Sequence, residues 1–135
     1  GAGRPPVADY LAEGSVIGIG TDSLASSPSL DVLEEARATR DLARSQGYDL
    51  PDLNRQIFHA LTLGGAHCLG LDGRTDSAGR ATDRIGVLTP HAVGDLAVFD
   101  VPTDGDPFAA LIDHGAGECV ATVLAGTLVH RRGDS

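Results

Sequence analysis

The first candidate for chemistry is a carboxylate at the end of a short apolar run. Residues 15–23 read Ser-Val-Ile-Gly-Ile-Gly-Thr-Asp-Ser. We expect this run to form a short buried strand, with Asp22 just past its carboxyl end, where α/β enzymes place their catalytic groups. An aspartate in such a place can equally cap a helix or close a turn, so the sequence leaves both interpretations open.

Ser23 and Ser26 lie close to Asp22 in the sequence and are the next candidates. Either hydroxyl could hydrogen-bond the second carboxylate oxygen of Asp22 or contact a substrate, and either could instead cap the following helix. The sequence has no His-x-His, His-Glu-x-x-His or Cys-x-x-Cys pattern, no phosphate-binding Gly-rich loop and no Gly-x-Ser-x-Gly elbow. Surface or hydrogen-bonded structural roles are expected for the scattered histidines, which are His59, His67, His91, His114 and His130.

Length, charge and cysteine content limit the class of protein. A chain of 135 residues, 41 % of them hydrophobic, can form a globular core but is too short for a complete (β/α)8 barrel of about 250 residues. The net charge of −9 argues against a nucleic-acid partner, and no apolar run approaches the ~20 residues needed to span a bilayer. Cys68 and Cys119 are expected to be buried free thiols, so we predict a cytoplasmic protein.

The first half of the chain is predicted to be helical, apart from the strand at residues 15–23. In the second of its helices, Ser27 is the expected N-cap and Pro28 the first helical residue. Arg40 and Arg44 are four residues apart in that helix, a spacing that predicts a solvent-exposed face. Turn signals and apolar spacing place the helices at residues 5–13, 27–46, 49–61 and 62–69.

The second half of the chain changes to strand-like spacing. Residues 71–84 are expected to be a loop, because Gly, Asp, Ser and Thr dominate and no apolar period survives. The alternation that follows predicts short strands at residues 85–88 and 95–100 and a hairpin of residues 119–124 and 127–131, with a short helix near residues 107–112. The hairpin turn is Ala-Gly, which is less typical than Asn-Gly.

Several stretches resemble the amidohydrolase superfamily, in particular the branch that holds the cytosine, guanine, adenosylhomocysteine and aminofutalosine deaminases and the triazine chlorohydrolases. The resemblance begins at Pro5 and includes Gly-Ile-Gly-Thr-Asp-Ser-Leu-Ala-Ser at residues 18–26 and Leu-Asp-Val-Leu-Glu-Glu-Ala at residues 30–36. It continues at residues 86–96, which follow the family pattern Gly-x-Ile/Leu-x-Pro-Gly-x-x-Ala-Asp-Leu. There His91 replaces the usual Gly and Gly94 the usual Ala.

The resemblance implies an α/β fold in which this chain is the C-terminal part of a TIM-barrel amidohydrolase. Residues 1–84 would supply the last barrel strand and helices, and residues 85–135 part of the accompanying β-sandwich. Asp22 would ligate one divalent metal, zinc or else iron, and would move the proton of the attacking water; the other ligands would lie outside this chain. The implied reaction is deamination of an aminated purine-like or other heterocyclic small molecule at a C–N bond that is not a peptide bond, and the isolated chain would be inactive.

A non-enzymatic role as a binding or assembly domain is the alternative. A barrel strand without its neighbours leaves an uncovered edge, which invites pairing with other chains. The expected partner that covers this strand edge is the N-terminal portion of the barrel, another chain, or a second copy of this chain.

Overall fold

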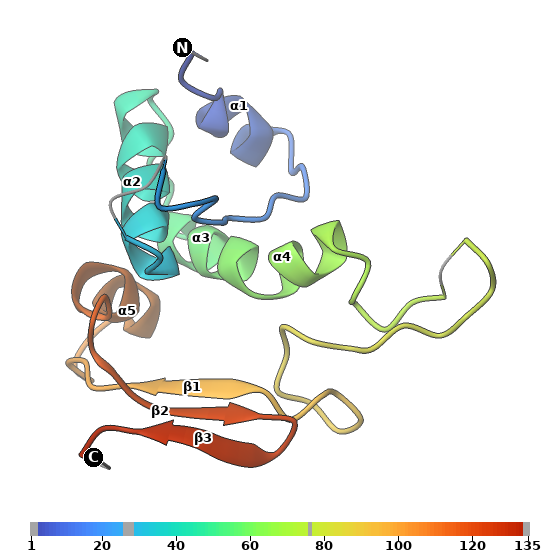
Figure 1. The fold of residues 1–135 in the computed structure, drawn as a ribbon. Coiled ribbons are helices and arrows are strands. Elements are labelled where there is room, and N and C mark those ends of the chain that lie inside the picture. Colours follow the sequence, from blue (N-terminus) through green and yellow to red (C-terminus); the bar gives the residue numbers. More distant parts are fainter. Residues whose placement is uncertain (1–2, 26–28, 76, 134–135) are drawn as a thin grey trace.

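The computed structural model describes residues 3–25, 29–75 and 77–133. A group of helices lies over one three-stranded antiparallel sheet with the strand order β1-β2-β3 (Figure 1). The fold is therefore mixed, with the first half of the chain helical and the sheet confined to the second half. The elements, in chain order, are α1 (Val7–Ala12), α2 (Val32–Ser45), α3 (Leu53–Leu61), α4 (Leu63–Cys68), β1 (Leu96–Phe99), α5 (Pro107–His114), β2 (Cys119–Leu124) and β3 (Thr127–Arg131).

Helix α2 begins later than the sequence predicted. Its N-cap is Asp31, whose backbone is in the β region and whose side chain accepts a hydrogen bond from the backbone N–H of Leu33 at 3.0 Å. Ser27 and Pro28, the expected cap and first residue, lie outside the described residues. The start was mispredicted because two capping residue types compete within a few positions, and sequence alone does not rank them.

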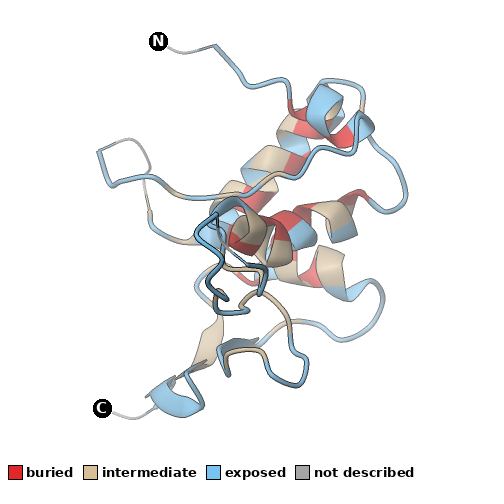
Figure 2. Cartoon of the chain, turned by 90° about the vertical axis from the view of Figure 1, so that its right-hand side faces the viewer, coloured by how far each residue is buried: buried red, intermediate tan, exposed pale blue. Residues whose placement is uncertain are grey.

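The hydrophobic core lies between helices α1, α2, α3 and α5. Every buried residue in the described part of the chain belongs to a helix, apart from Gly115 next to the end of α5 (Figure 2). The predicted apolar stripe of α3 is confirmed, because Leu53 and Ile57 are fully buried there. Helix α5 comes from the second half of the chain, yet its Ile112 is fully buried in the same cluster. Phe58 of α3 also contacts Phe108 of α5, with ring centroids 5.1 Å apart.

Arg40 does not lie on a solvent-exposed face, contrary to the prediction from its spacing. Its exposed fraction is 6 %, and its spacing along α2 matches that of the buried Leu33, Ala36 and Ala43. The prediction was wrong because α5, from much later in the chain, packs over this face of α2 and supplies Asp113 as a partner for the guanidinium. Arg44 is exposed, as expected.

The strand expected at residues 85–88 does not form. Gly86 has φ +78, outside the β region, and a side chain there would come within 2.8 Å of the backbone of Thr62. This glycine therefore allows the chain to turn closely against the α3–α4 junction. Residues 71–75 and 77–84 lie in the expected loop, in which isolated bridges pair Asp72 with Arg84 and Thr75 with Ala81.

The hairpin of β2 and β3 is confirmed. Ala125 and Gly126 both have positive φ, 48° and 80°, as a two-residue turn of type I′ requires. The backbone N–H of Ala125 donates to the side chain of Asp95 at 2.7 Å, which connects the turn to the residue before β1. This side-chain acceptor supports a turn that lacks the usual Asn at its first position.

No residue of the sheet is buried. Cross-strand pairs place Leu96, Val123 and Leu128 on one face, and Leu96 and Leu128 are partly exposed there. The described residues contain one sheet, so the second layer expected of a sandwich is not formed by them. An apolar sheet face of this kind is typically covered by another layer.

The cysteines are free, as predicted, but neither is buried. Cys68 is exposed at the end of α4, and Cys119 is half-buried in β2. The prediction of burial was wrong for Cys68, which is the last residue of α4 and is followed by the exposed Leu69 and Gly70. No helix within residues 3–25, 29–75 and 77–133 has both the length and the apolar character needed to cross a membrane.

Candidate functional site

The segment that carries Asp22 is not a strand in this structure. Residues 15–23 have no strand partner among the described residues. Their described backbone hydrogen bonds to other parts of the chain run from the N–H of Ser15 to the carbonyl of Tyr10 in α1 at 3.0 Å and from the N–H of Ile19 to the carbonyl of Ala60 in α3 at 3.2 Å. Val16 is 53 % exposed, whereas Ile17 and Ile19 pack against the core. The prediction of a buried strand was wrong for this chain because a strand needs a hydrogen-bonded neighbour, and here helices line the segment on one side only.

Glycines bring this segment unusually close to the α3–α4 junction. A Cβ atom on Gly64 would lie 2.4 Å from the carbonyl oxygen of Ile17, and one on Gly18 would lie 3.1 Å from the Cα atom of Gly65. Backbone can approach backbone in this way only where the side chain is absent. The position of residues 17–19, just before Asp22, is therefore fixed by the N-terminal half of α4.

A matched pair of substitutions tests this packing. Gly64→Ala is expected to lower the free energy of unfolding by about 1–3 kcal/mol, because the methyl group would force Ile17 away from α4. Gly65→Ala meets its nearest atom, the carbonyl oxygen of Ala60, at an ordinary 3.4 Å and replaces a helical glycine, so it should be neutral or stabilising by up to about 1 kcal/mol. Urea denaturation of both variants measures the difference, and equal effects would contradict the close packing.

Asp22 stands at the exposed end of this segment. Its φ is +58, a left-handed conformation that aspartate tolerates better than most residues with a side chain. Asp22 and Ser23 are both exposed, and each has an interaction partner within the chain. Ser26, the third predicted site residue, lies outside the described residues. The carboxylate can therefore reach a ligand from the solvent side.

The described residues do not complete a metal site around Asp22. No group of three or more His, Cys, Asp or Glu side chains in residues 3–25, 29–75 and 77–133 could hold an ion together. A structural zinc site needs four ligands and a catalytic one usually three from the protein. The exposed carboxylate of Asp22 has the chemistry of one such ligand, so the remaining ligands must come from elsewhere if an ion binds here.

One histidine has a clear hydrogen-bonded role. His67 Nδ1 lies 2.7 Å from an Asp72 carboxylate oxygen, and Arg74 Nε lies 3.1 Å from the same oxygen. Loss of solvent around Asp72 acts to raise its pKa, but the hydrogen bonds from the backbone of Arg74 and from His67 outweigh it, so the pKa is lowered. This confirms the structural role expected for His67, which ties the end of α4 to the loop after it.

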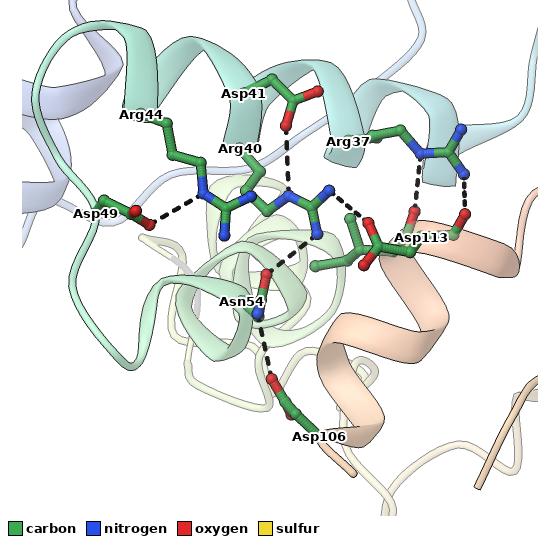
Figure 3. Close-up of polar contacts among 9 residues, drawn as sticks. Arg37, Arg40, Asp41, Arg44, Asp49, Asn54, Asp106 and Asp113 are labelled. Carbon is green, nitrogen blue, oxygen red and sulfur yellow. Dashed lines mark hydrogen bonds and ion pairs between the residues drawn. The ribbon is translucent and has the colours of Figure 1, made fainter. Parts of the chain in front are cut away.

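A second polar cluster, which the sequence did not predict, joins α2 to α3 and α5 (Figure 3). Arg40 Nη2 lies 2.5 Å from Asp113 Oδ1, and Arg40 Nη1 donates to Asn54 Oδ1 at 3.3 Å. Asn54 Nδ2 in turn donates to Asp106 Oδ2 at 3.2 Å. The only sequence signal was that Arg40 shares the helical period of the buried apolar residues, which can indicate a buried arginine as well as an exposed one.

Charge pairing within this cluster shifts two pKa values. Burial of the Arg40 guanidinium acts to lower its pKa, but the hydrogen bond and charge of Asp113 outweigh this and raise it. The hydrogen bond from Arg40 lowers the pKa of Asp113 below its usual range, against a smaller opposing effect of burial. Arg40 Nε also lies 3.5 Å from an Asp41 oxygen but makes no hydrogen bond, so this contact is the weakest of the cluster.

A cleft of about 330 Å³ lies between the start of the Asp22 segment and α3. Ser15 and Val16 line it from one side, and Arg55 and His59 from the other; Asp22 and Ser23 are not among its lining residues. The cleft therefore lies at the opposite end of the segment from the candidate carboxylate.

Comparisons with known proteins agree with the resemblance found in the sequence. The family model "Amidohydrolase family" matches residues 1–129. A 5-methylthioadenosine/S-adenosylhomocysteine deaminase of Halothermothrix orenii is 38 % identical over 131 residues, which are 92 % of this chain and 28 % of that protein. The protein of the same name from Desulforamulus reducens is 33 % identical over 105 residues, which are 73 % of this chain and 21 % of that protein.

Solved structures show the same likeness in fold. An adenosine deaminase from Xanthomonas campestris with bound zinc superposes with a TM-score of 0.78 at 24 % identity, covering 96 % of this chain and 29 % of that one. Guanine deaminase from E. coli gives a TM-score of 0.73 at 22 % identity, covering 94 % of this chain and 30 % of that one. The chain spans between 21 % and 30 % of the length of these four proteins.

Proposed function

The chain belongs to the amidohydrolase family, and we propose that it is the C-terminal portion of a metal-dependent hydrolase that acts on C–N bonds other than peptide bonds. The observation that carries the proposal is the family match over residues 1–129, which includes the Gly-Thr-Asp-Ser sequence at residues 20–23. We further propose that residues 1–84 belong to the barrel, in which the segment at residues 15–23 would become the last strand by pairing with strands outside the described residues, and that residues 85–135 belong to the sandwich.

Asp22 is proposed to be a metal ligand and the group that moves protons. A divalent ion, zinc by preference or else iron, would supply Lewis acidity and lower the pKa of water toward neutrality. The carboxylate of Asp22, exposed and preceded by a segment that α3 and α4 hold in place, accepts the proton of the attacking water and returns it to the leaving amine. Ser23 and Ser26 are proposed to orient this carboxylate or to contact the substrate.

The proposed substrate is a small heterocycle with an exocyclic amino group, similar to an aminated purine. Water adds at the ring carbon that bears the amine, the C–N bond breaks, and ammonia leaves as the carbonyl forms. Support comes from relatives named as deaminases of 5-methylthioadenosine and S-adenosylhomocysteine, and from the likeness in fold to adenosine and guanine deaminases. The two free cysteines suit a reducing compartment, and we propose a cytoplasmic location.

The uncovered surfaces are proposed to meet the rest of the barrel. Val16 is exposed within the segment at residues 15–23, which has no strand partner in the described part of the chain, and Leu96 and Leu128 are exposed on one sheet face. Their expected partner is the N-terminal portion of the same enzyme, or another chain or second copy that takes its place. Such a partner would bring the metal ligands that the described residues lack.

The test uses the protein at its natural length, whether that is these 135 residues or a longer chain that contains them. The purified protein is loaded with zinc and incubated with 5′-methylthioadenosine, adenosine, guanine and cytosine, and ammonia release is measured. Zinc-dependent release from at least one of these supports the proposal. No release, together with no zinc bound at micromolar concentration, would support the binding or assembly role instead.

A further inference from the structure

A single residue separates α3 from α4. Thr62 is the C-cap of α3 and the N-cap of α4, and its φ of −119° and ψ of −101° are not helical. The residues on both sides of it, Leu61 and Leu63, belong to the two helices. The contacts of Thr62 therefore decide how the carbonyl groups at the end of α3 are used.

The carbonyl groups near the end of α3 receive hydrogen bonds from two parts of the chain. The Thr62 hydroxyl donates to the carbonyl of Phe58 at 3.0 Å, and the Thr62 N–H donates to the carbonyl of His59 at 3.1 Å. The carbonyl of Ala60 accepts from the N–H of Ile19 at 3.2 Å. The last carbonyls of a helix lack partners within that helix, so Thr62 supplies donors for two of them and Ile19 for a third.

An unbroken helix would pair these groups differently. The N–H of Thr62 would then donate to the carbonyl of Phe58, and the N–H of Gly64 would donate to the carbonyl of Ala60. In the structure the Thr62 hydroxyl takes the place of its own N–H at Phe58, a back-bond of the kind that bends helices. The hydroxyl therefore favours the break over a continuous helix, in which Gly64 would compete with Ile19 for the carbonyl of Ala60.

The same break determines how closely α4 approaches the segment that carries Asp22. A Cβ atom on Gly64 would lie 2.4 Å from the carbonyl oxygen of Ile17, so backbone meets backbone there. The loop after α4 also packs on the break, because a Cβ atom on Gly86 would lie 2.8 Å from the carbonyl of Thr62. A change in the path of the chain at Thr62 would therefore be transmitted to residues 17–19.

We infer that Thr62 is a positioning residue for Asp22, because its hydroxyl keeps the Ala60 carbonyl available to Ile19. Ile19 precedes Asp22 by three residues, and the structure describes every residue between them. The catalytic consequence rests on the proposed function, because it assumes that Asp22 takes part in the reaction. The positional consequence does not, because it concerns only Ile19 and residues 20–22.

Thr62→Val is the variant that isolates the hydroxyl. Valine is also branched at Cβ, so the shape of the side chain is nearly kept while the donor to Phe58 is lost. Thr62→Ser keeps a hydroxyl and is the conservative rescue. The matched control is Thr82→Val, since the Thr82 hydroxyl donates to the carbonyl of Arg74 at 2.7 Å and Thr82 is half-buried like Thr62, but it lies in the loop after α4.

The variants are made in the protein at its natural length, and two quantities are measured. Amide hydrogen exchange of Ile19 and residues 20–22 is expected to be about fivefold faster in Thr62→Val, the factor that corresponds to one hydrogen bond, and unchanged in Thr62→Ser and Thr82→Val. For ammonia release, kcat per folded enzyme is expected to fall about fivefold in Thr62→Val, with KM within about twofold, and to return in Thr62→Ser. A merely structural role would lower the amount of folded enzyme and leave its kcat unchanged.

The outcomes separate this inference from the proposed function. Exchange of Ile19 at the wild-type rate in Thr62→Val, or raised equally in Thr82→Val, would overturn the positioning role, whatever the activity. Faster exchange in Thr62→Val alone supports it even if no substrate is turned over, in which case only the proposed function fails. An unchanged kcat despite that faster exchange would overturn the catalytic consequence. Should Thr62→Val not fold, Thr62→Ala removes the same hydroxyl, and unaltered exchange of Ile19 in that variant would also overturn the role.

Discussion

Asp22→Asn is expected to lower the ammonia-releasing activity of the natural-length enzyme by at least about a thousandfold. The amide cannot accept the proton of the attacking water, a contribution worth about 10²–10⁴ in rate, and it is a poorer metal ligand than a carboxylate. Asparagine tolerates the left-handed backbone found at this position, φ +58, so the change should leave the fold intact. Initial rates at saturating substrate and zinc content by mass spectrometry measure the two effects.

The control for this prediction is Asp9→Asn. Asp9 is an exposed aspartate of α1 with the same change of charge, and it is not part of the proposed site. It should keep the activity within about twofold, because isolated surface charges contribute little. The activity of Ser23→Ala should lie between those of Asp22→Asn and Asp9→Asn, with a loss of about tenfold or less relative to the wild type. Activity retained in Asp22→Asn at the wild-type level would refute the role of this carboxylate.

Arg40→Ala is expected to lower the free energy of unfolding by about 2–4 kcal/mol. The guanidinium is buried and bonds to Asp113 and Asn54, so its removal opens a cavity and leaves these groups without their partner. This loss of stability is smaller than the loss expected when one partner of a fully buried ion pair is removed, because the Asp113 side chain is 41 % exposed and can be rehydrated. Urea denaturation of the two proteins gives the difference.

Arg44→Ala, one turn further along α2, is the matched control. Arg44 pairs with Asp49 at 3.0 Å, but both side chains are exposed, so the loss should be about 0.5 kcal/mol or less. Similar losses in the two variants would contradict the distinction between a buried and a surface arginine drawn from the structure.

The pH dependence gives a second check on the Arg40 cluster. The pKa of Asp113 is lowered in the folded protein by the hydrogen bond from Arg40. The stabilisation is therefore complete above the pKa of the unfolded chain, about 4, and is lost as the pH falls through the lower pKa of the folded state. The difference in stability between wild type and Arg40→Ala should narrow as the pH is lowered from 6 to about 3. A constant difference would mean that Asp113 does not contribute through its charge.

The sequence by itself determined the local structure wherever a short-range rule decides it. The hairpin turn at Ala125-Gly126 is predicted by a two-residue Ala-Gly sequence between two apolar runs, and both residues adopt the positive φ that such a turn needs. The buried stripe of α3 is predicted by the spacing of Leu53 and Ile57. It also determined the family, because the Gly-Thr-Asp-Ser sequence and the pattern at residues 86–96 survive as short contiguous strings.

Only the tertiary structure decided the features that depend on distant contacts. Arg40 is buried because α5 covers it, and the Asp31 carboxylate reaches a turn 86 residues away. Gly86 breaks an apparent strand because the chain turns there against the α3–α4 junction. Residues 15–23 have the composition of a buried strand, but hydrogen-bonded strands require neighbours, and within the described residues only helices lie beside them. The spacing of apolar residues and the local composition indicate which secondary structure a segment favours, whereas its long-range contacts depend on how the whole chain folds.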